Sequence, residues 1–218
     1  LSKMGKAMMD DIIEDIEDLR ERFSDATNEM PKSPIEIQFE MGDALITGKV
    51  DSVYGNRYIS VCNSSDQLKY LLKAFVIYLG IIANGETDIE FVFIPKKLKT
   101  NSLVPAGKIS QADAIAILTQ YLEYYKQGHH SYFHFFPAIG NGDMAMISEG
   151  YESFWEAYID SFEDEKSFIF NDDYLDTAVS HGFFGPAVYG ILVDNVKAIF
   201  KPLKEHFPAF FKAPQKRK

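Results

Sequence analysis

The sequence is short of cysteine, of long apolar runs and of positive charge, and each shortage excludes a class of protein. Cys62 is the only cysteine among 218 residues, so the chain forms no internal disulfide and suits a reducing compartment. No apolar run reaches the roughly 18 residues that a membrane-spanning helix needs, and no signal peptide is recognisable. The formal net charge is −10, so the surface as a whole does not attract nucleic acid. Because the chain begins with Leu1 rather than methionine, we expect a fragment of a longer protein.

What the sequence does have is enough apolar material for a proper core. Hydrophobic residues make up 46% of the chain and aromatic residues 14%. There is no internal repeat, low-complexity segment or interdomain linker. We therefore expect residues 1–218 to form a single domain.

Hydrophobic periodicity predicts a mixed α/β fold. Apolar residues at helical spacing predict helices over residues 5–28, 66–84, 110–128, 147–162 and 188–203. Strands are predicted over 35–40, over 45–62 as two strands around a turn, and over 89–94. This order predicts a small mixed sheet with helices on both faces, followed by a mainly helical C-terminal part.

The stretch from Leu45 to Asp66 organises this prediction. Alternation makes it two adjacent strands, joined by a tight turn at Gly55-Asn56, where both residues tolerate a positive φ. Gly48 has no side chain in mid-strand, which suggests a bulge or a close backbone approach.

A Mg²⁺-dependent nuclease would build its metal site on these two strands. The first strand would offer a carboxylate, and the second a carboxylate followed two residues later by a lysine. Asp51 supplies the first acid, but Cys62 and Ser64 have the spacing that the second acid and the lysine need. Since a cysteine and a serine do not replace those charges, the sequence indicates a catalytic frame without its catalysts.

The order of elements resembles the C-terminal domain of the exodeoxyribonuclease V gamma chain, the RecC family. No single motif is strong, and the long helix lacks the family's tryptophan; the ordered series carries the resemblance, from about Leu1 to Leu203. The matching positions are Gly5, Ile46-Thr47-Gly48, Leu68 to Gly85, Tyr124 to Gly128 and Phe135-Phe136-Pro137.

The same stretch is similar to the nuclease domain of the RecB family, which has a restriction-endonuclease-like, PD-(D/E)XK fold. Gly48 and Asp51 match the start of its pattern, whereas Cys62, Asn63 and Ser64 stand where Asp-Tyr-Lys would be. RecB-type nucleases also carry a metal-binding histidine before the sheet, and no histidine of this chain precedes the predicted sheet. Three of the four expected ligands or catalysts are missing.

The resemblance therefore implies a non-catalytic domain that binds no metal or other cofactor. It implies RecB-like and RecD-like partner subunits in a bacterial, cytoplasmic helicase–nuclease that processes double-strand breaks. It also implies that DNA is reached through the complex and that no membrane is involved.

The candidate site residues also have plain structural interpretations. Asp51 would make a structural hydrogen bond or pair with Lys49, and Cys62 would be a small buried strand residue rather than a nucleophile. His129, His130 and His134 invite a zinc hypothesis, but no cysteine cluster accompanies them, so packing or surface roles are favoured.

Two kinds of contact surface are suggested. Lys96, Lys97 and Lys99 lie in an irregular segment and are weak candidates for contacts to DNA phosphates, with a solvated loop at least as plausible. The aromatic segment Tyr132 to Pro137 and the loop Gly182 to Pro186 are candidates for a subunit contact, and the alternative for both is core.

Three functions follow. The favoured one is a scaffold and DNA-handling domain without catalysis. The second is an active Mg²⁺ nuclease whose catalytic residues have migrated. The third is a pure protein-interaction module, which the acidic balance supports.

Overall fold

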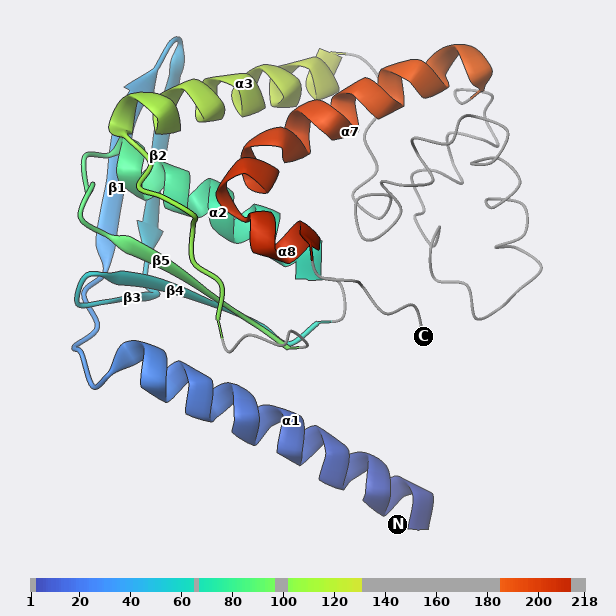
Figure 1. Ribbon diagram of the computed structural model, residues 1–218. Helices are drawn as coiled ribbons and strands as arrows, with labels where there is room; N and C mark the ends of the chain where they lie inside the picture. Colours follow the sequence, from blue (N-terminus) through green and yellow to red (C-terminus); the bar gives the residue numbers. More distant parts are fainter. Residues whose placement is uncertain (1–2, 65–66, 97–101, 131–184, 213–218) are drawn as a thin grey trace. The chain divides into compact units, whose positions relative to one another are not determined.

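The computed structural model describes residues 3–64, 67–96, 102–130 and 185–212 (Figure 1). They belong to two compact units, Leu1–Thr119 with His206–Phe210, and Gln120–Glu205 with Phe211–Lys218. The organisation of 1–218 as a single domain stays a prediction. No helix in the described ranges is both long and apolar enough to cross a bilayer. The elements are α1 Lys3–Thr27, β1 Ile35–Met41, β2 Ala44–Val50, β3 Val53–Tyr54, β4 Arg57–Cys62, α2 Gln67–Ala83, β5 Glu90–Pro95, α3 Gln111–His130, α7 Pro186–His206 and α8 Pro208–Lys212.

The first unit holds two small sheets. Strands β1 and β2 form an antiparallel pair, from Ile35 opposite Val50 to Met41 opposite Ala44. Strands β3, β4 and β5 form the second sheet, antiparallel between β3 and β4 and parallel between β4 and β5. Helix α2 provides the crossover that a parallel pair requires. The predicted mixed α/β fold with small sheets flanked by helices is therefore confirmed, with two sheets in place of one.

Helices α1 and α2 cover opposite faces of the three-stranded sheet (Figure 1). Alternate residues of β4 and β5 divide between these faces. Ile59, Val92 and Ile94 are buried together with Leu19 of α1. On the other face Phe91 stacks between Tyr58 and Tyr78 of α2, with ring centroids 5.3 and 5.2 Å apart.

Helix α2 confirms the helix predicted over residues 66–84 and is extensively buried. Its residues from Tyr78 to Ala83 are all buried, and Gly85, with φ of 101°, terminates the helix. The neighbouring Asn84 ties this end to β1. Its Nδ2 donates to the carbonyl of Glu36 over 3.1 Å, and its Oδ1 accepts from the backbone N–H of Gln38 over 2.9 Å.

The prediction of one strand running from residue 45 into the turn is wrong. The strand breaks at Asp51-Ser52, so β2 pairs with β1 while β3 pairs with β4. The expected special role of Gly48 is wrong too, because it pairs regularly with Ile37 and an added Cβ would meet nothing within 4 Å. The predicted turn is confirmed, with φ of 57° at Gly55.

Helix α3 begins as predicted and ends later. Ser110 Oγ accepts from the backbone N–H of Asp113 over 3.1 Å, as an N-cap does. The helix continues past Gly128 to His130. Along this helix Leu118 is buried, whereas Tyr125 is 65% exposed.

Helix α7 confirms the predicted closing helix, with Leu192, Val196 and Leu203 among its buried residues. Within the second unit, Tyr121 Oη donates to the carbonyl of Ile199 over 2.8 Å. The predicted helix over residues 147–162 lies outside the described residues.

Candidate functional site

Asp51 lies on the surface, in the two-residue connection between β2 and β3. Its side chain is 57% exposed, and its Oδ1 is 3.6 Å from Nζ of Lys49. The interpretation of Asp51 as the partner of Lys49 is confirmed. Both side chains are more than half exposed, so water screens the pair and its contribution to stability is small.

Cys62 ends β4 and is buried. Only 1% of the residue is exposed, and its thiol donates a long hydrogen bond, with 3.6 Å between Sγ and the backbone oxygen of Ser64. In the parallel ladder Cys62 is aligned with Pro95. The interpretation of Cys62 as a small buried strand residue is confirmed.

Asp51, Cys62 and Ser64 lie on β4 and the chain segments beside it, and they carry few groups that could bind a metal or activate water. The backbone N–H of Ile59 donates to the carbonyl of Ser52 over 2.9 Å, so the connection that carries Asp51 lies beside the middle of β4. The frame offers one exposed carboxylate, one buried thiol and one hydroxyl. Mg²⁺ is bound through oxygen by one or two carboxylates, and the single carboxylate here is already paired with Lys49. Across the described ranges, no three His, Cys, Asp or Glu side chains are grouped so that they could hold a metal ion. The residues at the frame do not fit a magnesium site.

Lys96 follows directly after β5 and faces α1. Its Nζ is 2.8 Å from Oδ2 of Asp15, and only 23% of its side chain is exposed. The ammonium group of Lys96, which the sequence suggested as a contact for DNA phosphates, is therefore paired with a carboxylate of the same chain. Lys97 and Lys99 lie outside the described residues, as do Tyr132 to Pro137 and His134.

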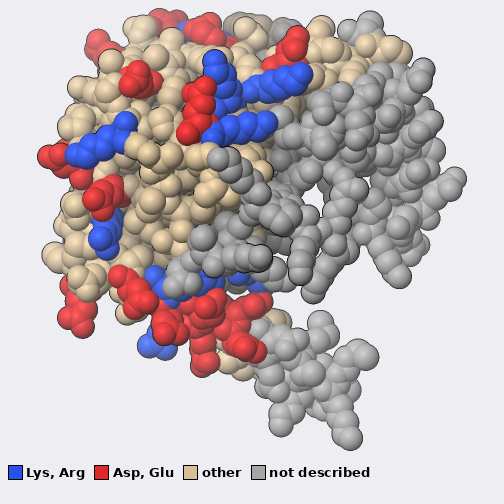
Figure 2. Space-filling model, in the orientation of Figure 1, with Lys and Arg blue, Asp and Glu red and all other residues tan. Residues whose placement is uncertain are grey.

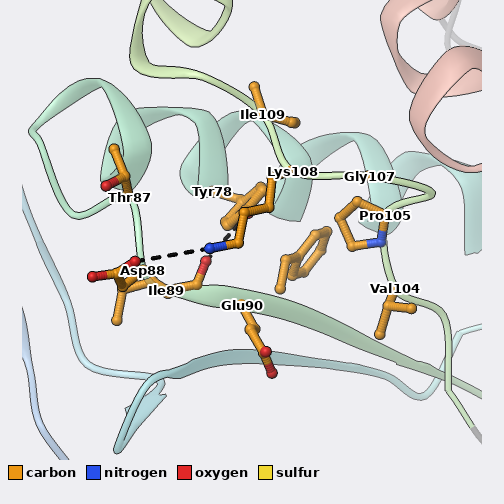
Figure 3. A pocket seen from close by; sticks show the side chains of 11 residues that line it. Tyr78, Thr87, Asp88, Ile89, Glu90, Val104, Pro105, Gly107, Lys108 and Ile109 are labelled. Atoms are coloured by element: carbon orange, nitrogen blue, oxygen red, sulfur yellow. Dashed lines mark hydrogen bonds and ion pairs between the residues drawn. The ribbon is translucent and has the colours of Figure 1, made fainter.

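A pocket of about 350 Å³ opens beside the start of β5 (Figure 3). Tyr78 and Phe91 supply aromatic surface, and the chain segment from Val104 to Ile109 supplies the other side. At its edge Lys108 Nζ is 3.8 Å from Oδ1 of Asp88, as the dashed line in Figure 3 marks. Both of those side chains are almost fully exposed, so this ion pair is weak.

The pocket carries no evident catalytic pair. Tyr78 Oη donates to the carbonyl of Ile89 over 3.2 Å. Burial, and then the charge of Glu90, raise the pKa of Tyr78, which keeps its hydroxyl protonated. The carboxylate of Glu90 in turn contacts Arg57, with 3.4 Å between Oε2 and Nε.

A row of lysines on α7 is a feature that our sequence prediction missed. Lys197, Lys201 and Lys204 are spaced four and three residues apart, which places them on one face of the helix. In the described residues none of the three forms an ion pair with a carboxylate, and Nζ of Lys204 lies 5.6 Å from the ring centroid of Phe211. Burial, and then the charge of Lys197, lower the pKa of Lys204. The i, i+4, i+7 spacing was visible in the sequence.

A comparison of the chain with known protein families identifies the family to which it belongs. The family model described as the RecC C-terminal domain matches residues 1–141, well over half of the chain. The chain belongs to the RecC C-terminal domain family. The resemblance seen in the ordered elements is thereby confirmed over residues 1–141. The RecC family implies a part in a RecBCD-type complex that acts in DNA repair and recombination.

The RecC match also bears on the individual sites. It includes α1, the five strands of the described residues, α2 and α3, and with them Asp51, Cys62 and Ser64. Helix α7 and its lysine row lie outside the matched residues. RecC is a subunit of a nuclease–helicase complex. Membership in this domain family does not by itself show whether the domain is catalytic. A comparison with curated proteins gives no match.

Proposed function

We propose that this chain is a non-catalytic scaffold and DNA-handling domain of a RecBCD-type helicase–nuclease. The observation that carries the proposal is the frame around β4. A carboxylate already paired with Lys49, a buried thiol and a serine occupy the positions where a nuclease needs two acids and a lysine. Without those charges the frame neither holds Mg²⁺ nor activates water.

The proposed ancestry is a restriction-endonuclease-like domain related to the RecB nuclease domain. What supports it is a mixed sheet with a parallel β4–β5 pair, a crossover helix between these strands, and Asp51 before the turn into β4. In this proposal residues 1–218 form one domain of a longer cytoplasmic bacterial subunit. Its partners are RecB-like and RecD-like subunits, and it uses no cofactor of its own.

For the DNA-handling part of the proposal, the lysine row of α7 is a better candidate than Lys96. The Lys96 ammonium is committed to Asp15 and is largely covered. Lys197, Lys201 and Lys204 present like charges on one face, which repel one another unless an anion lies beside them. A helix C-terminus also favours nearby cations, so a purely structural role for the row is the alternative that a binding measurement must exclude.

The test of non-catalysis is made in the assembled complex. RecB-like and RecD-like subunits are combined with the wild-type chain or with a variant carrying Asp51→Ala and Ser64→Ala. The proposal expects equal degradation of linear duplex DNA by both complexes, in the presence of Mg²⁺ and ATP. If the double substitution abolishes degradation while assembly is unchanged, the catalytic centre lies here and the proposal fails.

A further inference from the structure

Strand β2 has an edge that no described residue covers. Asn84 binds the carbonyl of Glu36 and the N–H of Gln38 on β1, so these backbone groups point away from β2. In an antiparallel pair, the residues directly opposite such groups also point their own groups away from the partner strand. The residues opposite are Lys49 and Thr47. Their backbone N–H and C=O groups therefore lie on the far edge of β2.

Leu45, two residues before Thr47, continues the same alternation. The outward-facing backbone groups of Leu45, Thr47 and Lys49 are called the open edge below. Within the described ranges none of these groups has a hydrogen-bond partner, and all three residues are exposed. The open edge thus presents donors and acceptors at a regular spacing of two residues, which an extended backbone matches.

The other outer strands of the two sheets are covered. Asn84 covers β1, as described above. On β3 the carbonyl of Val53 accepts from the N–H of Ser33 over 2.8 Å. On β5 the backbones of Phe93 and Leu103 exchange two hydrogen bonds, of 2.8 and 2.7 Å. Since proteins normally cover or blunt their sheet edges, the open edge of β2 is the place where this fold leaves room for another strand.

The side chains beside the open edge describe the strand that fits there. On one face of the sheet Leu45 is 59% exposed. On the other face Gly48 leaves open space, because an added Cβ would meet nothing within 4 Å, and the neighbouring Ile46 is half-buried. An incoming strand covers both places with apolar side chains three residues apart, which point to opposite faces.

Charge disfavours a second copy of the chain as that strand. In a two-fold dimer, two copies of β2 pair all of Leu45, Thr47 and Lys49 only in an antiparallel register centred on Thr47. This register sets Asp43, just before β2, opposite Asp51, just after it, at both ends. Each end then brings two carboxylates together with the one ammonium of Lys49, and like charges directly opposite each other are destabilising. Each copy also has a formal net charge of −10, and Asp and Glu side chains gather along the visible side of α1 (Figure 2).

We infer that the open edge binds an extended segment of a different protein chain, which adds a third strand to the β1–β2 sheet. The segment carries a large apolar side chain beside Gly48 and an apolar one beside Leu45. Main-chain hydrogen bonds supply the affinity in this kind of binding, and the side-chain positions supply the selectivity. The inference rests on the proposed role as a subunit of a complex, in which a tethered segment is held at a high effective concentration.

Hydrogen exchange of individual amides, followed by NMR, tests the open edge itself. In the free chain the N–H groups of Leu45, Thr47 and Lys49 should exchange fast, whereas those of Ile46 and Gly48, which face β1, should exchange slowly. The probe is a peptide of about seven residues, with Phe to face Gly48 and Ile to face Leu45 in an antiparallel strand. Binding of this peptide should slow the exchange of the first group at least about tenfold. If the first group is already protected in the free chain, the edge is covered and the inference fails.

Methylated peptides separate edge pairing from side-chain contact. Methylating the peptide nitrogen that faces Thr47 removes a hydrogen bond and should weaken binding at least about tenfold. Methylating the nitrogen of the next residue, which points away from β2, should change the affinity by less than about twofold. In the chain, Thr47→Pro removes the matching donor and should also weaken binding at least about tenfold. Proline is tolerated on an edge strand whose N–H faces solvent, and circular dichroism checks that this variant folds.

The inference is overturned if the peptide does not bind, if both methylated peptides bind equally, or if sedimentation shows a dimer that Thr47→Pro dissociates. The methylated peptides decide the matter even where Thr47→Pro fails to fold. None of these results depends on whether the chain cuts DNA, so failure here is distinct from failure of the non-catalytic assignment.

Discussion

Arg22 donates from Nη1 to the backbone carbonyl of Pro95, 2.7 Å away, and so joins the first helix to the end of the last strand of the sheet. The guanidinium is 8% exposed and also pairs with Asp18 one turn earlier. A buried charge of this kind is retained only where its hydrogen bonds are made. The contact anchors the part of α1 whose Leu19 and Phe23 pack against the sheet.

The first prediction follows from this contact. Arg22→Met keeps most of the aliphatic stem but removes the charged donor to Pro95, so it should lower the free energy of unfolding by about 1–3 kcal/mol. Arg20→Met, on the exposed side of the same helix, should change it by less than about 0.5 kcal/mol. Urea unfolding followed by circular dichroism measures both, and equal effects would contradict the anchoring role.

The second prediction concerns the turn between β3 and β4. Gly55 has φ of 57°, and a Cβ there would lie 2.6 Å from Sδ of Met30. Gly42 has φ of 63° and open space around it, so Gly42→Ala measures backbone strain alone, about 1 kcal/mol. Gly55→Ala should cost clearly more, about 2–3 kcal/mol with the added steric term. Thermal unfolding of the two variants, and of Gly55→Ala with Met30→Ala, separates the backbone strain from the steric clash. If Met30→Ala does not reduce the destabilisation caused by Gly55→Ala, the predicted clash with Met30 is wrong.

The third prediction tests the lysine row on α7. Changing Lys197, Lys201 and Lys204 to Gln should weaken binding of single-stranded DNA at low salt. It should also reduce the slope of log K against log salt by about 2, since each phosphate contact contributes about 0.7. The matched control changes Lys69, Lys73 and Lys108 to Gln and removes the same charge from other exposed positions. Equal losses in both triple variants would mean that net charge, and not the row, governs binding.

The fourth prediction concerns alkaline pH. Burial raises the pKa of Tyr58 to about 12, and the opposing hydrogen bond with Ser60 has the smaller effect. The unfolded tyrosine loses its proton near pH 10. The contribution of Tyr58 to the free energy of unfolding should therefore be constant below pH 10 and should fall as pH rises from 10 towards 12. Tyr58→Phe should make that fall shallower in urea unfolding measured across this range. An unchanged slope would contradict the burial of a neutral phenol.

Local signals in the sequence predicted most of the first unit. The apolar run in α2 is broad enough to predict a buried helix, and its end is specified by Gly85, which takes a positive φ. Ser110 and Asp113 predict the start of α3 because capping depends on neighbouring residues alone. Gly55 predicts the turn for the same reason.

The remaining features depend on tertiary pairing. Strand alternation continues through Asp51 and Ser52, so nothing local indicates that β2 and β3 enter different sheets. The apolar seam of α1 is continuous from Met9 to Phe23, and only the extent of the sheet decides which part of it is covered. Lys96 lay in an irregular segment by sequence, and its ion pair with Asp15 links residues distant in the chain.

The most direct test of the account measures DNA cleavage by the purified chain with Mg²⁺ or Mn²⁺, on linear duplex and on single-stranded DNA. The account predicts no cleavage above a buffer control with either metal. Cleavage that depends on the metal and is abolished by Asp51→Ala would contradict it.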